Sequence, residues 1–403
     1  MHSQTEFDWR SIGALNTVST LAQVGQFGIA FVVLPVWLVE QGLNASQLGM
    51  FAASLWLGQL PGLGFAPWLC KRFGDKQVIL AGLFSTLLAL TCAALVGWPY
   101  WLIAGALAGF GLGLRWIALE PWLYLIAPAH ARGRLVGFHE TLIALAPIVA
   151  PLLAAYFGIH GKAIFWIGAG FTLAAIVPLC LARSATIQTH QPGTSVSGTS
   201  TGGARMRAAI AQIFRQPRDH IFKQGIVIAL LGGMSEAALS GLFAIFAQER
   251  GYAVLQITDL LALFGVGGLL LQYPVGWLTD HTSLGTAAIS CALGTVLVAL
   301  CMSLPLAYLP MQVAVFLLGG FITAFLTMAL IASTTTGSGD MAQNVSLLSM
   351  LYTLSAVAGP LIAGLVMQTS HADALMWLIA LAALSMASIL ALYGRNSRTR
   401  LPA

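Results

Sequence analysis

Residues 284–303 read LGTAAISCALGTVLVALCMS, a run without a single charged side chain. The hydrocarbon core of a bilayer is about 30 Å thick, so a helix needs about 20 apolar residues to cross it. Eleven further stretches of similar length and composition lie on either side of this run, separated by short polar gaps. Lipid admits only helices and closed barrels, and these stretches are too long for barrel strands. The sequence therefore predicts an all-α polytopic membrane protein with twelve transmembrane helices.

The predicted spans form two sets of six. The apolar stretches long enough to cross a membrane predict the first six spans at 12–39, 46–70, 76–96, 100–127, 134–158 and 163–182. They predict the second six at 221–248, 254–279, 284–303, 308–333, 343–368 and 374–394. The longest break contains the flexible stretch THQPGTSVSGTSTGG, followed by the basic, amphipathic RMRAAIAQIFRQPRD. The sequence thus predicts an N-terminal six-helix bundle at 1–182, a cytoplasmic linker at 183–220 and a C-terminal six-helix bundle at 221–403.

The basic residues predict the orientation. If both termini are cytoplasmic, Lys162 and Arg250 fall outside, Arg115 falls within a span, and the rest of the 18 Lys and Arg residues fall inside. Cytoplasmic loops of membrane proteins carry this excess of Lys and Arg. The net charge of +5 is thus explained by topology and by contact with membrane lipids, and we expect no nucleic-acid partner.

Several function classes lack their sequence features. The five cysteines form no Cys-x-x-Cys or Cys/His cluster, so we expect no disulfide framework and no metal site. The sequence also contains no P-loop, which argues against ATP-driven pumping, and most histidines lie near span ends. We therefore expect no cofactor and no enzymatic activity.

The two halves resemble each other at one cytoplasmic turn. The turn after the second span reads PWLCKRFGDKQVIL, and the turn after the eighth reads QYPVGWLTDHTSLGTAA. Duplicated halves of this kind are typical of transporters. The second turn resembles the Gly-x-Leu-x-Asp signature of the major facilitator superfamily, with Gly276, Leu278 and Asp280 in place. The first turn departs from it, because Pro67 and Lys71 replace the first glycine and the aspartate, whereas Arg72, Gly74 and Lys76 fit.

A narrower resemblance lies at the fourth and fifth spans. The stretch ALEPWLYLIAPAHARGRLVGFHETL is similar to the Glu-Ser-Trp-Leu-Asn … Arg-Gly-Arg pattern of the YcaD-like bacterial branch of that superfamily. The matching residues are Glu120, Trp122, Leu123, Arg132, Gly133 and Arg134. Pro121 and Tyr124 replace the serine and the asparagine. The resemblance implies a bacterial cytoplasmic-membrane transporter in which Asp280 and Arg72 contribute to a cytoplasmic latch.

Proline and glycine pairs predict where the helices bend. The fifth span carries Pro147 and Pro151, and the eleventh carries Gly359 and Pro360. These pairs resemble the glycine-proline motif that the superfamily has on helices between its two halves. We therefore assign a gating role to these four residues and to Gly276, Asp280 and Arg72; ordinary helix packing is the alternative.

Charged side chains inside spans are expensive in lipid and are candidates for function. Arg115 lies about sixteen residues, or roughly 24 Å, from the outer end of the fourth span, close to the membrane midplane. Its fork of N–H donors suits a carboxylate or phosphate. It is predicted to bind substrate, or else to form an ion pair with an acid on a neighbouring helix.

Glu120 follows five residues later, on a different face of the same helix and just before the kink expected at Pro121. A carboxylate in such a place suits a proton-coupling site; a hydrogen-bonded packing group is the alternative.

Two further acids complete the set of proton-coupling candidates. Glu140 lies roughly 9 Å inside the fifth span. It is expected to pair with Arg115, Arg132 or Arg134, while the preceding His139 points elsewhere. Glu236 lies in the small, polar sequence LLGGMSEAALSG of the seventh span and is assigned to substrate or proton binding.

Uncharged polar and aromatic residues complete the predicted binding site. They are Asn16, Thr20 and Gln23 at helical spacing on the first span, Trp116 beside Arg115, and Tyr352 on the eleventh span.

Together these features predict a proton-coupled secondary transporter of a small organic anion or zwitterion, working as a monomer by alternating access. A proton-driven multidrug efflux antiporter is the main alternative, and a non-transporting membrane receptor is a further one.

Overall fold

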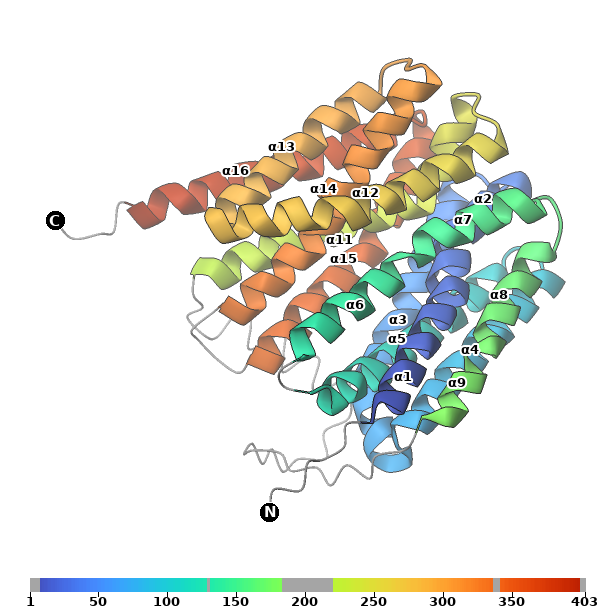
Figure 1. The fold of residues 1–403 in the computed structure, drawn as a ribbon. Helices are drawn as coiled ribbons and strands as arrows, with labels where there is room; N and C mark the ends of the chain where they lie inside the picture. Colours follow the sequence, from blue (N-terminus) through green and yellow to red (C-terminus); the bar gives the residue numbers. More distant parts are fainter. Residues whose placement is uncertain (1–7, 129–130, 183–219, 336–340, 399–403) are drawn as a thin grey trace.

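The computed structural model describes residues 8–128, 131–182, 220–335 and 341–398. Within these residues, twelve helical segments are long and apolar enough to span a membrane, which confirms the predicted fold class (Figure 1). The predicted linker at 183–220 lies outside the described residues, except for His220 at the start of α11.

The first six spans comprise ten helical pieces. Span 1 consists of α1 (Trp9–Gln23), η1 (Val24–Val33) and α2 (Leu34–Glu40). Spans 2, 3 and 4 are the single helices α3 (Ala45–Phe73), α4 (Asp75–Leu95) and α5 (Trp101–Ile126). Span 5 consists of α6 (Arg132–Ala144) and α7 (Ala146–Phe157), and span 6 of α8 (Ala163–Ala174) and α9 (Ile176–Leu181). The last six spans are single helices: α11 (His220–Glu249), α12 (Val254–His281), α13 (Leu284–Met302), α14 (Tyr308–Thr335), α15 (Met341–Thr369) and α16 (Ala374–Arg398).

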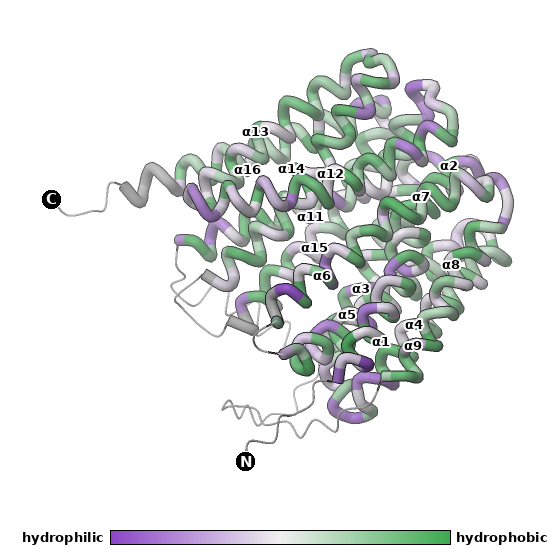
Figure 2. The backbone as a smooth tube through the Cα atoms, viewed as in Figure 1, coloured by the Kyte–Doolittle hydropathy of each residue, from purple (hydrophilic) through white to green (hydrophobic). Residues whose placement is uncertain are grey.

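These helices form two bundles that follow the order of the sequence. The blue-to-green spans 1–6 lie together in Figure 1, and the yellow-to-red spans 7–12 form the second group. Figure 2 shows apolar residues over most of each helix and hydrophilic ones mainly at the ends and in the connections. The first residues of α1 and the last residues of α16 lie on the same side of the molecule (Figure 1). We call the helix ends on that side the terminal ends and the opposite ones the outer ends.

Three of the predicted continuous spans are interrupted. Span 1 has a π-helical segment over Val24–Val33, and spans 5 and 6 break at Leu145 and Ala175. Pro147 and Pro178 lack the N–H that would bond to Ile143 and Ala174, so the preceding helix ends at Ala144 or Ala174 and each proline lies in the first turn of the next helix. Within α-helices, π-helical turns are frequent at functional sites.

The two bundles meet near their outer ends. α3 packs against α15, and α7 packs against α12. A Cβ atom built at Gly49 of α3 would lie 2.3 Å from the carbonyl oxygen of Pro360 in α15, and one at Gly265 of α12 would lie 3.1 Å from that of Pro147 in α7. The absence of a side chain at these glycines is what allows the backbones to approach so closely. By contrast, α1 and α5 pack mainly within their own bundle.

Candidate functional site

Arg115 occupies the centre of the first bundle. Arg115 is only 3% exposed, and its guanidinium donates hydrogen bonds to side chains of span 1. Nη1 donates to Oγ of Ser19 at 3.0 Å, Nε donates to Oε1 of Gln26, and Nη2 donates to Oε1 of Gln23. These three acceptors are spaced four and three residues apart, so they lie on one side of span 1. Gln26 is held in turn by Thr86, to whose Oγ1 its amide nitrogen donates at 2.8 Å.

All three acceptors of Arg115 are neutral. The ion pair with a neighbouring acid, which was one expectation for this residue, is absent from the described part of the chain. A guanidinium has five N–H donors, so two of them have no acceptor among the described residues. The site therefore presents a positive charge with spare donors in a region of low dielectric.

Glu120 lies on the same helix and faces a buried histidine. Nε2 of His139 is 4.0 Å from Oε1 of Glu120, and the Glu120 side chain is 18% exposed. His139 itself is fully buried, and its Nδ1 lies 3.0 Å from Oδ1 of Asn16. The Asn16 side-chain nitrogen donates to the carbonyl oxygen of Ile12 at 2.9 Å, so the atom that faces His139 is the amide oxygen. An amide oxygen can only accept a hydrogen bond.

This arrangement fixes the tautomer of His139. Because Nδ1 donates to Asn16, the neutral ring presents its lone pair on Nε2. That atom has no hydrogen-bond partner among the described residues and is turned toward Glu120. A protonated Glu120 could donate to it, and a protonated His139 could pair with an ionised Glu120. His139 points away from the neighbouring Glu140, as expected, and it joins Glu120 on α5 to Asn16 on α1.

Glu140 has a different partner from those expected. Its Oε1 accepts a hydrogen bond of 3.0 Å from Oη of Tyr124. Neither Arg115 nor Arg134 pairs with it, and the side chain of Arg132 lies outside the described residues. Glu140 is exposed, because the α6 turn that carries it buries His139 and leaves the next residue facing outward.

The second bundle has an acid of its own deep inside a span. The hydroxyl of Tyr352 on α15 donates to Oε2 of Glu236 on α11. The two helices approach closely, since a Cβ atom at Gly233 would lie 2.4 Å from the carbonyl oxygen of Tyr352. These two predicted site residues are thus brought together.

The remaining predicted binding residues lie along an open strip of α1. Gly13 and Thr17 are exposed, and Thr20 and Gln23 are half-buried. The Thr20 hydroxyl donates to the carbonyl oxygen of Asn16 at 2.8 Å. The strip runs from the terminal end of the helix to Gln23, a partner of Arg115. Trp116 is half-buried, one helical turn before Glu120.

The predicted gating residues fall into two groups. Pro147, Gly359 and Pro360 lie at close helix contacts: Gly359 faces the carbonyl oxygen of Met234, and a Cβ atom there would lie 2.1 Å from it. Pro151 is buried in α7.

The predicted latch residues Arg72 and Asp280 are exposed at the terminal ends. The guanidinium of Arg72 lies 5.5 Å from the ring centre of Trp68 and 5.3 Å from that of Phe73. Asp280 is exposed and makes no ion pair within the described residues. A Cβ atom at Gly276 would meet nothing within 4 Å.

Sequence reasoning missed Gln26 and Ser19 as partners of Arg115, as well as His139. Gln26 is an amide within an apolar span, which is a usable signal. Ser19 carries no such signal, because small hydroxyl residues are common in membrane helices.

Fold and site together define a twelve-span helical membrane protein with a buried polar centre in its first bundle. Residues 17–337 and 225–403 match the family model described as Major Facilitator Superfamily. The chain belongs to this superfamily of membrane transporters, as the signature at Gly276, Leu278 and Asp280 indicated.

Relatives confirm the narrower resemblance. The chain is 26% identical over 246 residues to the uncharacterized MFS-type transporter YcaD of Salmonella newport (strain SL254) and to that of Salmonella typhi. The match covers 60% of this chain and spans only about three fifths, 59%, of the length of these relatives.

Solved structures show the same fold. A mutant form of the nucleoside transporter NupG superposes with a TM-score of 0.80 at 11% identity, covering 95% of this chain and 99% of that one. A D-xylose-proton symporter superposes with a TM-score of 0.73 at 13% identity, covering 96% and 97%.

Proposed function

We propose that this protein is a proton-coupled secondary transporter of a small organic solute that carries an anionic group. The protein would act as a monomer in a bacterial cytoplasmic membrane, with both termini in the cytoplasm. Membership of the superfamily supports transport, and the site supports the coupling and the class of solute.

The observation that carries the proposal is the arrangement of Glu120, His139 and Asn16. Glu120 and His139 face each other at 4.0 Å, and the ring nitrogen between them has no hydrogen-bond partner among the described residues. Because an isolated charge on either group is costly in a largely buried site, the pair is suited to hold one exchangeable proton. Glu120 is partly exposed, so water can reach the pair.

Arg115 supports an anionic group on the solute. Its two spare N–H donors and its positive charge suit a carboxylate or a phosphate. Gln23 lies at the end of the open strip of α1, and the anion would replace it as a hydrogen-bond acceptor of Arg115. Substrate and proton sites would then share α5, so that binding at one changes the electrostatic free energy of the other.

The arrangement of the bundles supports alternating access. They are joined near the outer ends through Gly49 and Pro360, and through Gly265 and Pro147. The latch residue Asp280, at the terminal ends, makes no ion pair with any described residue. We therefore assign this conformation to the state that is open toward the cytoplasm, and rocking about the α3–α15 and α7–α12 contacts would open the other side.

The test begins with a ligand screen. The purified protein is heated with panels of carboxylates, phosphate esters, zwitterions, nucleosides, pentoses and cationic amphiphiles, because a ligand of the folded state raises the melting temperature. Ligands that stabilise the protein are then added to proteoliposomes that contain a pH-sensitive dye. Anionic solutes should cause solute-dependent proton movement.

Three results would contradict the proposal. Saturable solute flux with no proton movement at any imposed gradient would exclude coupling. Stabilisation without flux would favour a receptor. Proton movement driven by cationic amphiphiles instead would identify the efflux antiporter, for which the aromatic rings of Trp116 and Tyr124 near Glu120 are the supporting feature.

A further inference from the structure

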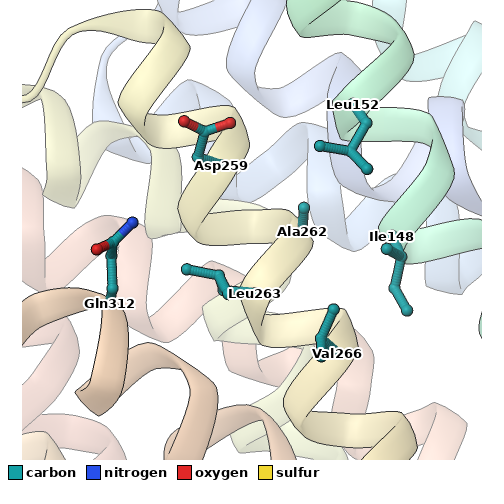
Figure 3. A pocket seen from close by; sticks show the side chains of 7 residues that line it. All are labelled: Ile148, Leu152, Asp259, Ala262, Leu263, Val266 and Gln312. Carbon is teal, nitrogen blue, oxygen red and sulfur yellow. The ribbon is translucent and has the colours of Figure 1, made fainter. Parts of the chain in front are cut away.

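A groove lies on the side of the molecule where the two bundles meet, away from the Arg115 site. It has a volume of about 280 Å³ and is lined by α7, α12 and α14. In Figure 3 it lies over α12, with Ile148 and Leu152 of α7 on one side and Gln312 of α14 on the other. Its remaining lining residues, all on α12, are Asp259, Ala262, Leu263 and Val266.

The groove opens toward lipid. The α12 residues next to it on the same face are Leu255, 56% exposed, and Leu270, 57% exposed. The neighbouring helices likewise expose Leu152 and Leu309. Large apolar side chains exposed on three adjacent membrane-spanning helices are expected where those helices contact acyl chains.

The groove is polar at one end and apolar along the rest. Asp259 is five residues from the outer end of α12, and Gln312 is four residues from that of α14, so both lie within about 8 Å of the helix ends. Val266 lies about 10 Å deeper along α12. This polarity gradient matches that of one bilayer leaflet, with headgroups near the helix ends and acyl chains below them.

Asp259 lacks a cationic partner within the described part of the chain. No Lys, Arg or His of those residues lies within 4.0 Å of its carboxylate. Its hydrogen bond from Oη of Tyr308 is long, at 3.5 Å. A carboxylate at the edge of the lipid core is costly unless a positive charge accompanies it.

We propose that the groove binds an amine-bearing phospholipid of the outer leaflet. Its ammonium group donates to Asp259, its polar linkage lies beside Gln312, and one acyl chain runs over Leu263 and Val266 toward Ile148. The positive head complements the Asp259 carboxylate, and the apolar floor complements the chain. Because the groove is lined by residues of both bundles, the lipid would contact the two moving parts at once.

The experiment is native mass spectrometry of the full-length protein. The protein is released from mixed vesicles containing equal amounts of phosphatidylethanolamine and phosphatidylglycerol, and the retained lipid is identified. Wild-type protein should retain the ethanolamine lipid preferentially. Asp259→Asn keeps the shape but removes the charge, so this preference should fall about tenfold, as for the loss of one charge-assisted hydrogen bond. Leu152→Trp should fill the groove and reduce retention of both lipids.

Glu249→Gln is the matched control, because it removes an exposed carboxylate at the outer end of α11, away from the groove. Its lipid preference should equal that of the wild type. Unchanged preference in Asp259→Asn, or no preference in the wild type, would overturn the proposal. The proposal would also be overturned if a cationic detergent displaced the bound lipid while the protein showed no preference between the two phospholipids.

Discussion

The contact between α3 and α15 predicts that one added methyl group will change which side of the protein is open. At Gly49 the backbones touch, and the side chain introduced by Gly49→Ala would lie 2.3 Å from the carbonyl oxygen of Pro360 and 3.2 Å from Cα of Gly364. Ordinary contacts begin near 3.4 Å, so the two helices must separate by about 1 Å. Separation at this place loosens the outer closure between the bundles.

The free-energy cost can be bounded. Forcing an extra methyl into a close contact typically costs about 1–3 kcal/mol. If the outer ends of α3 and α15 separate in the outward-open state, that state pays little of this cost. The ratio of outward-open to inward-open protein should therefore rise by roughly 5- to 150-fold.

The assay uses a single cysteine in a background from which the five native cysteines have been removed. Thr20→Cys places a thiol at the half-buried end of the open strip of α1. A membrane-impermeant maleimide added from outside reaches it only when the outer side is open. Labelling should be slow with Gly49 and faster by the same factor with Gly49→Ala.

Gly64→Ala provides the matched control on the same helix. A Cβ atom at Gly64 would meet nothing within 4 Å, so labelling should not change. If Gly49→Ala labels no faster than Gly64→Ala, then the α3–α15 contact does not close the outer side, and the assigned conformation is wrong.

Further predictions concern the Arg115 site, the contacts of Arg250 at the outer ends of the helices, and the topology. Arg115→Lys keeps the charge but loses the fork of donors, so solute flux should fall at least tenfold while the melting temperature changes little; normal flux would show that the fork is irrelevant. Arg250→Ala removes two hydrogen bonds to Asp373 and one to Leu304, so it should lower the free energy of unfolding by about 1–3 kcal/mol, with coupling intact in the folded protein. An impermeant maleimide should fail to label Ser195→Cys from outside, and rapid labelling there would reverse the proposed orientation.

The sequence predicted the spans well because lipid imposes one strong constraint on every segment. The second span, expected at 46–70, is Ala45–Phe73, and the tenth, expected at 308–333, is Tyr308–Thr335. Pro147 was visible in the sequence as a possible bend, but the π-helical segment at Val24–Val33 has no proline within it and was not predicted.

The site was predicted residue by residue but not as a network. Arg115, Glu120 and Glu236 could be found because each is a charged residue in an apolar span. The pairing of side chains within the site could not be predicted, since the contact of His139 with Asn16, for example, joins residues 123 positions apart. The positions of the apolar spans also could not show that Glu140 accepts a hydrogen bond from Tyr124 and does not pair with an arginine. The rotation of each helix about its axis determines which side chains meet.

The central claim is that Glu120 carries the coupling proton. Glu120→Gln fixes this position in a neutral state of nearly the same shape, and Glu236→Gln is the comparison in the second bundle. Both variants are measured in proteoliposomes for accumulation driven by a pH gradient and for counterflow at equal pH. The account predicts that Glu120→Gln loses pH-driven accumulation and keeps counterflow, whereas Glu236→Gln keeps both. Full pH-driven accumulation by Glu120→Gln would contradict it.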